Sequence, residues 1–90
     1  MPAPPANMID VTVPDLDLGT TPVFVSVWHC KTGQTVIEGD RLVELFAGDV
    51  IIDLPAPATG KLAAQEAQED EPVAAGQVIG RIAASPDETL

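Results

Sequence analysis

The chain is poor in aromatic residues, in cysteine and in basic side chains. Aromatic residues make up only 3% of its 90 residues, so aliphatic side chains must fill the core. The single cysteine, Cys30, excludes an intramolecular disulfide and agrees with a reducing cytoplasm. Fourteen acidic residues against 4 basic ones give a formal charge of -10, which disfavours binding to nucleic acid or anionic lipid. A protein partner with a basic surface suits such a chain better.

Long apolar runs and targeting signals are also missing from the sequence. No apolar run approaches the ~20 residues that a membrane helix requires. The first residues, MPAPPANM, lack the basic start and apolar stretch of a signal peptide, and their prolines predict an extended tail. We therefore expect a cytoplasmic location without membrane contact, a flexible tail over residues 1–8 and a second tail over residues 85–90.

Short β-branched runs, separated by glycine, proline and aspartate, fill the rest of the chain. Their spacing of roughly ten residues is typical of an all-β sandwich or barrel. The sequence also repeats itself: Val36, Gly39, Leu42 and Leu45 recur as Val73, Gly76, Ile79 and Ile82. Two copies of one β unit would pack with approximate two-fold symmetry. In this interpretation Val13-Pro14 and Leu54-Pro55 open the two halves.

One stretch of the chain resembles the attachment hairpin of lipoyl domains. Leu42–Pro57 reads LVELFAGDVIIDLPAP, where the usual family pattern is LVEVETDKATVEVPAP. Val25–Asp40 and Glu71–Ile82 are similar to the family's central stretch and closing strands, and the resemblance covers residues 9–84. It implies the fold of that family. We therefore expect an all-β, flattened β-barrel or sandwich of two four-stranded sheets with pseudo-two-fold symmetry, a lipoyl/biotinyl-like barrel-sandwich hybrid.

The resemblance places Asp49 where the family carries its attachment lysine. A carboxylate cannot form the amide that holds lipoate or biotin, so the sequence predicts no cofactor. A convex hairpin tip offers no cleft that would exclude water, so no catalytic residue is expected either. The favoured function is a stand-alone, degenerate lipoyl-like domain, a non-enzymatic protein-interaction module. The alternative is a lipoyl or biotin carrier-type component of a 2-oxo-acid dehydrogenase or biotin-dependent enzyme complex. In that case Lys31 or Lys61 would carry the group, and the partner would be a dehydrogenase- or carboxylase-type complex.

Gly48 and Asp49 between two apolar runs predict a two-residue hairpin in which Gly48 takes a positive φ. The tip would then consist of Ala47, Gly48, Asp49 and Val50. Side chains alternate between the two faces of a strand. We therefore expect a wholly apolar core face, made of Val43, Leu45, Ala47, Val50, Ile52 and Leu54.

The other face of this hairpin would carry Glu44 opposite Asp53, and Phe46 opposite Ile51. Two like charges in direct opposition are tolerable only in water, so this face should be solvated. We expect these residues to contact a partner. Alternatively, the Thr20–Val23 loop or the N-terminal tail covers Phe46 and Ile51.

The remaining candidates for chemistry have simpler explanations. His29 and Cys30 are neighbours on a strand-like run, so their side chains point to opposite faces and form no nucleophile pair. Two such residues do not make a zinc site, and no metal is expected. The acidic run from Glu66 to Glu71 lacks the glycine of a calcium loop and is interpreted as a solvated turn. Trp28 is expected to anchor the core.

Overall fold

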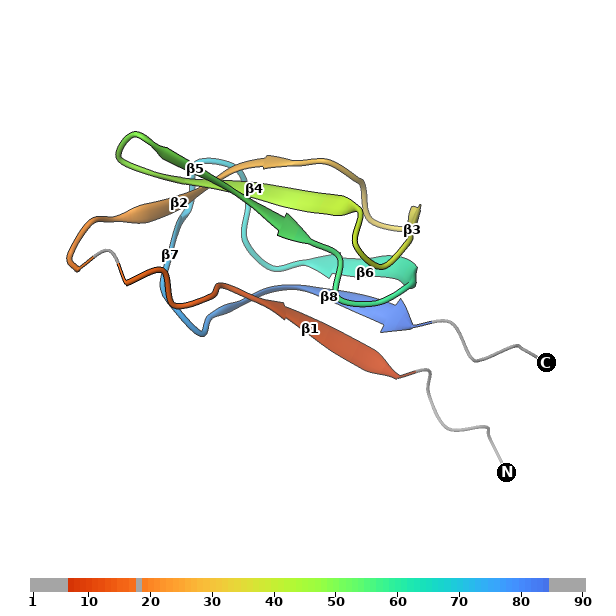
Figure 1. Ribbon diagram of the computed structural model, residues 1–90. Helices are drawn as coiled ribbons and strands as arrows, with labels where there is room; N and C mark the ends of the chain where they lie inside the picture. Colours follow the sequence, from red (N-terminus) through yellow and green to blue (C-terminus); the bar gives the residue numbers. More distant parts are fainter. Residues whose placement is uncertain (1–6, 18, 85–90) are drawn as a thin grey trace, which may run out of the picture.

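The computed structural model describes residues 7–17 and 19–84, and every regular element among them is a β-strand (Figure 1). The strands are β1 (Met8–Thr12), β2 (Val23–Trp28), β3 (Thr35–Val36), β4 (Arg41–Ala47), β5 (Val50–Pro55), β6 (Gly60–Gln65), β7 (Pro72–Val73) and β8 (Val78–Ala84). β1 thus begins at Met8, the last residue of the predicted N-terminal tail. Residues 1–6 and 85–90 of the two predicted tails lie outside the described residues. No helix in the described part of the chain could cross a membrane.

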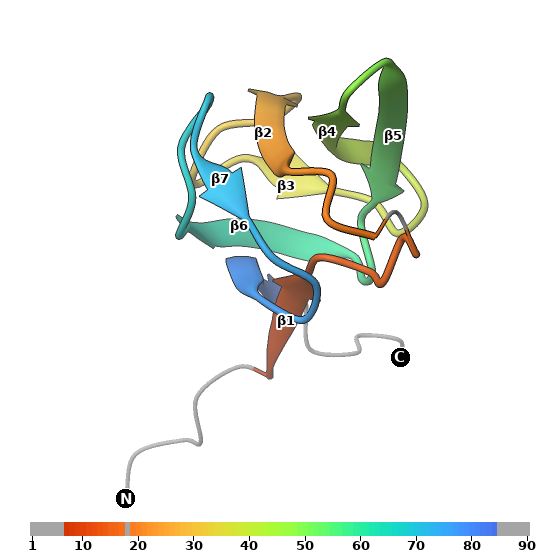
Figure 2. The ribbon, with the colours of Figure 1, turned by 90° about the vertical axis from the view of Figure 1, so that its left-hand side faces the viewer.

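The strands form two antiparallel four-stranded sheets that face each other (Figures 1 and 2). Sheet A has the order β1-β8-β6-β3, and sheet B has the order β5-β4-β2-β7. In residues 7–17 and 19–84 no hydrogen-bonded strand pair joins the two sheets, so the fold is a sandwich rather than a closed barrel. The largest fully buried side chains are aliphatic: Leu42, Leu45, Leu62, Ile79, Ile82, Val25 and Val43. The predicted fold class is confirmed.

Equivalent turns reveal the two-fold repeat. Each turn spans four residues. The backbone N–H of the first residue donates a hydrogen bond to the side chain of the fourth, and the backbone N–H of the fourth residue donates to the carbonyl of the first. The turns join Lys31 to Gln34 and Ile37 to Asp40 in one half, and Gln68 to Glu71 and Ala74 to Gln77 in the other. Because each copy repeats the same local bonds, the halves are related by approximate symmetry.

The predicted equivalence of Val13-Pro14 with Leu54-Pro55 is wrong. The Gly76 N–H donates to the Val13 carbonyl, and the Gly39 N–H donates to the Ala56 carbonyl. Val13-Pro14 therefore corresponds to Ala56-Pro57. The reason is that β5 continues through Pro55, so the chain leaves sheet B only after the dipeptide that the sequence pattern suggested.

Candidate functional site

The β4–β5 hairpin has the predicted register. Ala47 pairs with Val50, Phe46 with Ile51, Leu45 with Ile52, Glu44 with Asp53 and Val43 with Leu54. Gly48 has a φ of 58°, as a two-residue turn of this kind requires. Asp49 is exposed at the tip. The tip lies at the opposite end of the molecule from the start of β1 and the end of β8 (Figure 1).

The core face of the hairpin is apolar as predicted, with one exception. Val43, Leu45, Ala47 and Leu54 are buried, and Ile52 packs against the core while partly exposed. Val50 is 47% exposed, so its predicted place in the core is wrong. Because β5 is the edge strand of sheet B, Val50 follows the turn with a neighbouring strand on one side only.

An apolar row crosses the outer face of sheet B just behind the tip. Strand pairing aligns Ile51, Phe46, Phe24 and Pro72 on the four strands β5, β4, β2 and β7. Ile51 is 59% exposed, whereas Phe46 is half-buried and stacks on Phe24 with ring centroids 5.3 Å apart. The expectation of an exposed side chain thus holds for Ile51 and fails for Phe46. The side chain stacked on Phe46 comes from β2, not from the Thr20–Val23 loop.

A polar row lies next to the apolar row, farther from the tip. The Ser26 hydroxyl donates a hydrogen bond of 3.0 Å to a Glu44 oxygen. The Asp53 carboxylate lies 3.8 Å from His29 Nε2 and 3.8 Å from an Arg41 nitrogen. The Ser26 hydroxyl and the Arg41 guanidinium explain why two acidic residues can stand directly opposite each other in the sheet.

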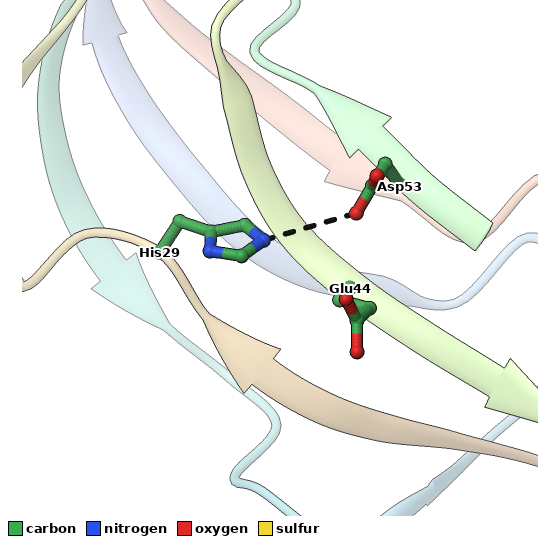
Figure 3. A group of neighbouring side chains, drawn as sticks. All are labelled: His29, Glu44 and Asp53. Carbon is green, nitrogen blue, oxygen red and sulfur yellow. Dashed lines mark ion pairs between the residues drawn. The ribbon is translucent and has the colours of Figure 1, made fainter. Parts of the chain in front are cut away.

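The sequence did not predict that His29 joins this row (Figure 3). The strand register shifts between Val25 and Val27, which marks a β-bulge in β2. A bulge inserts one extra residue, so the side chains beyond it change faces. His29 therefore lies on the exposed outer face beside Glu44 and Asp53, while Cys30 turns inward. Strand alternation read without the bulge would place His29 toward the core.

Cys30 and the two lysines lie away from the hairpin tip. Cys30 is 7% exposed, and its burial, followed by the charge of Asp40, raises the pKa of its thiol. The predicted absence of a Cys–His nucleophile pair agrees with His29 and Cys30 facing opposite sides. Lys31 opens an exposed turn, and Lys61 is exposed on β6. Hydrogen bonds of Gly33 and Gln34 to Leu62 hold that turn beside β6.

The profile of the biotin/lipoyl family, described as "Biotin-requiring enzyme", matches residues 9–82. The chain belongs to the biotin/lipoyl family. This lipoyl-type domain is 26% identical to the lipoyl domain of the 2-oxoglutarate dehydrogenase complex from Azotobacter vinelandii, whose structure was solved in solution. The two structures superpose with a TM-score of 0.70, covering 82% of this chain and 94% of that chain.

Curated relatives of this lipoyl-type domain are components of dehydrogenase complexes. The chain is 35% identical over 76 residues to the succinyltransferase component of the 2-oxoglutarate dehydrogenase complex of Escherichia coli K12. It is 33% identical over 81 residues to the acetyltransferase component of the pyruvate dehydrogenase complex of Corynebacterium glutamicum. These matches cover 84% and 90% of the lipoyl-type domain but only 19% and 12% of the relatives, so the chain spans a fifth of their length or less.

These similarities overturn the favoured prediction, a degenerate, stand-alone interaction module. That prediction gave decisive weight to one residue, Asp49, whereas the similarity to carrier domains extends over both sheets of the lipoyl-type domain. A lipoyl domain is a carrier module and is not itself catalytic. The findings therefore favour the alternative, a carrier-type component.

Proposed function

We propose that this chain is a carrier-type component that works with a 2-oxo-acid dehydrogenase complex, with residues 8–84 as the folded unit. The observation that carries this proposal is the match to the lipoyl domain of a 2-oxoglutarate dehydrogenase complex, which extends over 94% of that domain. The relatives named as acyltransferase components of such complexes support the same assignment. The free thiol of Cys30 agrees with a cytoplasmic location.

The carried group needs an amine, and Asp49 at the hairpin tip has none. Lys31 and Lys61 are the lysines of the chain. An amide to lipoate therefore forms on one of them. We favour Lys31, because it opens an exposed turn that a modifying enzyme can approach, whereas Lys61 lies within a strand between β3 and β8.

The hairpin end is the proposed surface for recognition by the complex. The apolar row ends in the exposed Ile51 beside the exposed Val50, and Asp49 adds a negative charge at the tip. Covering apolar surface stabilises a complex by about 25 cal/mol per Å². The formal charge of -10 favours a basic surface on the partner. Ile51, Phe46, Glu44 and Asp53 are thus the candidate partner contacts.

A second candidate function is a biotin carrier in a carboxylase-type complex. The family description, "Biotin-requiring enzyme", favours it. The same lysines would carry the group, so the two functions differ in which ligase modifies the chain and in which complex binds it.

Intact mass spectrometry after co-expression with a lipoate ligase, or separately with a biotin ligase, tests these functions. We expect a lipoyl mass gain that Lys31→Arg abolishes and Lys61→Arg leaves in place. Asp49→Lys is the positive control, because it places an amine at the tip of the hairpin and shows whether the ligase accepts this fold. An unmodified native protein beside a modified Asp49→Lys protein would overturn the carrier proposal. A biotinyl gain alone would establish the second candidate.

A further inference from the structure

We propose that His29, Glu44 and Asp53 form a binding site for a divalent transition-metal ion of the zinc type. The three side chains are neighbours on the outer face of sheet B (Figure 3). Glu44 lies on β4, Asp53 lies on β5, and His29 directly follows the end of β2. One ligand atom from each, all within 4.8 Å of one another, converges on the outer face. This proposal is independent of any lipoyl group.

The backbone of the sheet holds the three residues in place. Glu44 and Asp53 are paired across β4 and β5. The His29 N–H donates a 2.8 Å hydrogen bond to the Leu42 carbonyl, which fixes His29 against β4. The imidazole points across β4 toward Asp53, and its Nε2 lies 3.8 Å from the nearer carboxylate oxygen (Figure 3). Ligands mounted on strands need little rearrangement to bind an ion.

The symmetry-related half of the fold has an equivalent group of three side chains on sheet A. Asp10 pairs with Arg81 across β1 and β8, as Asp53 pairs with Glu44. The Glu66 N–H donates to the Ile79 carbonyl, as the His29 N–H donates to Leu42. The symmetry thus relates the set His29, Glu44 and Asp53 to the set Glu66, Arg81 and Asp10.

A cation holds the second set together. The Arg81 guanidinium lies 3.3 Å from Asp10 and 2.7 Å from Glu66, so one positive group bridges two carboxylates. In the half that contains the β4–β5 hairpin, Glu44 stands at the position that corresponds to Arg81. The carboxylates of Glu44 and Asp53 and the imidazole of His29 therefore lie close together without a bridging arginine between them. A bound metal ion would supply the positive charge that Arg81 supplies in the other half.

The donor atoms select the kind of ion. One imidazole nitrogen and two carboxylate oxygens match zinc, which takes His and Asp or Glu ligands, whereas calcium and magnesium prefer oxygen ligands alone. Zinc–ligand distances of about 2.0–2.2 Å place neighbouring ligand atoms roughly 3.4 Å apart, so atoms that now lie up to 4.8 Å apart need to approach one another by at most about 1.4 Å. Water completes the coordination on the exposed side. The Ser26 hydroxyl, bonded to Glu44, orients this ligand.

Arg41 competes with a metal ion for the carboxylate of Asp53. Its guanidinium lies 3.8 Å from Asp53, and its side chain is 69% exposed. An exposed ion pair of this kind contributes little, and a divalent ion displaces it. Removing Arg41 should therefore strengthen metal binding.

Titration of the native 90-residue chain with zinc chloride tests the proposal, by calorimetry and by NMR of the imidazole protons. His29 is the only histidine, so its ring signals are unambiguous. We expect a single ion per chain and a shift of those signals. His29→Ala and Asp53→Asn should each weaken binding by about tenfold or more, and Arg41→Gln should strengthen it by about threefold or more.

Two further variants separate loss of the site from loss of the fold. Glu44→Arg removes one ligand and places a cation beside Asp53, as Arg81 lies beside Asp10 in the other half, so it should abolish zinc binding while thermal melting stays close to that of the native protein. Glu66→Gln removes an acid from the symmetry-related set and should leave zinc affinity unchanged. The proposal is overturned if zinc does not bind saturably, if binding survives both His29→Ala and Glu44→Arg, or if Arg41→Gln weakens it.

Discussion

Phe24 and Phe46 stack on the outer face of sheet B, with ring centroids 5.3 Å apart and ring planes 20° from parallel. The stack joins β2 to β4 at a place where outward-facing side chains would otherwise meet only water. Ile51 continues the same row on β5 and remains 59% exposed. The apolar row therefore has a centre that contributes to stability and an edge that is free to contact a partner.

Substitutions at these two positions should separate stability from association. Ile51→Thr should change the free energy of unfolding by less than about 0.5 kcal/mol, because an exposed side chain loses few contacts. Phe46→Glu should cost about 1–3 kcal/mol, because it removes the aromatic stack and adds a charge to a half-buried position. Urea unfolding measures both. Ile51→Thr should still weaken binding to a purified 2-oxo-acid dehydrogenase complex; unchanged binding would exclude Ile51 as a contact.

The hairpin turn should depend on the backbone of Gly48. At a φ of 58°, Gly48→Val should destabilise the protein by about 1–3 kcal/mol through backbone strain. A Cβ at this position would meet only the Thr21 Cγ2 atom, at an ordinary 3.8 Å, so the Cβ itself has room and the backbone conformation is what disfavours the substitution. Gly48→Asn is the matched control, because asparagine tolerates this conformation and should melt closer to the native protein. Equal melting temperatures for both variants and the native protein would contradict the strain argument.

A substitution at Gly80 should disturb the packing of Trp28. A Cβ at Gly80 would lie 2.8 Å from Trp28 Cη2 and 3.0 Å from the Ala64 carbonyl oxygen. Gly80→Ala must therefore move the indole, whose N–H donates a 2.9 Å hydrogen bond to the Ala67 carbonyl. We expect a loss of about 1–3 kcal/mol and a red-shifted fluorescence, since Trp28 is the only tryptophan. Native-like emission and stability in this variant would show that the side chains adapt without moving the ring.

Cys30 should react slowly in the native protein. Burial, with a smaller effect of Asp40, raises the pKa of its thiol, and the reactive form is the thiolate. The folded state thus keeps this proton to a higher pH than the unfolded chain. Its contribution to stability is complete below the ordinary pKa range of a thiol and is lost as pH rises through and above that range.

Alkylation followed by mass spectrometry measures the reactivity of Cys30. At mildly alkaline pH the native thiol should be modified far more slowly than the same thiol in urea. Equal rates in the two states would mean that the loop carrying Cys30 opens readily.

Local rules in the sequence determined much of this protein. Gly48 and Asp49 between apolar runs set the turn, and the turn set the pairing of Glu44 with Asp53, because hairpin length fixes register. The resemblance of Leu42–Pro57 to the lipoyl hairpin implied the two-sheet fold. Such features depend on neighbours in the chain, so they can be predicted without knowing the packing.

Contacts between distant strands decided the rest. The bulge in β2 turned His29 to the outer face beside Glu44 and Asp53. No local sequence pattern predicted this bulge. Val50 is exposed because β5 lies at the edge of sheet B. Phe46 is half-buried because β2 lies beside β4 and places Phe24 against it. Side-chain burial depends on which strands lie side by side, and hydrogen bonding between distant segments sets that order.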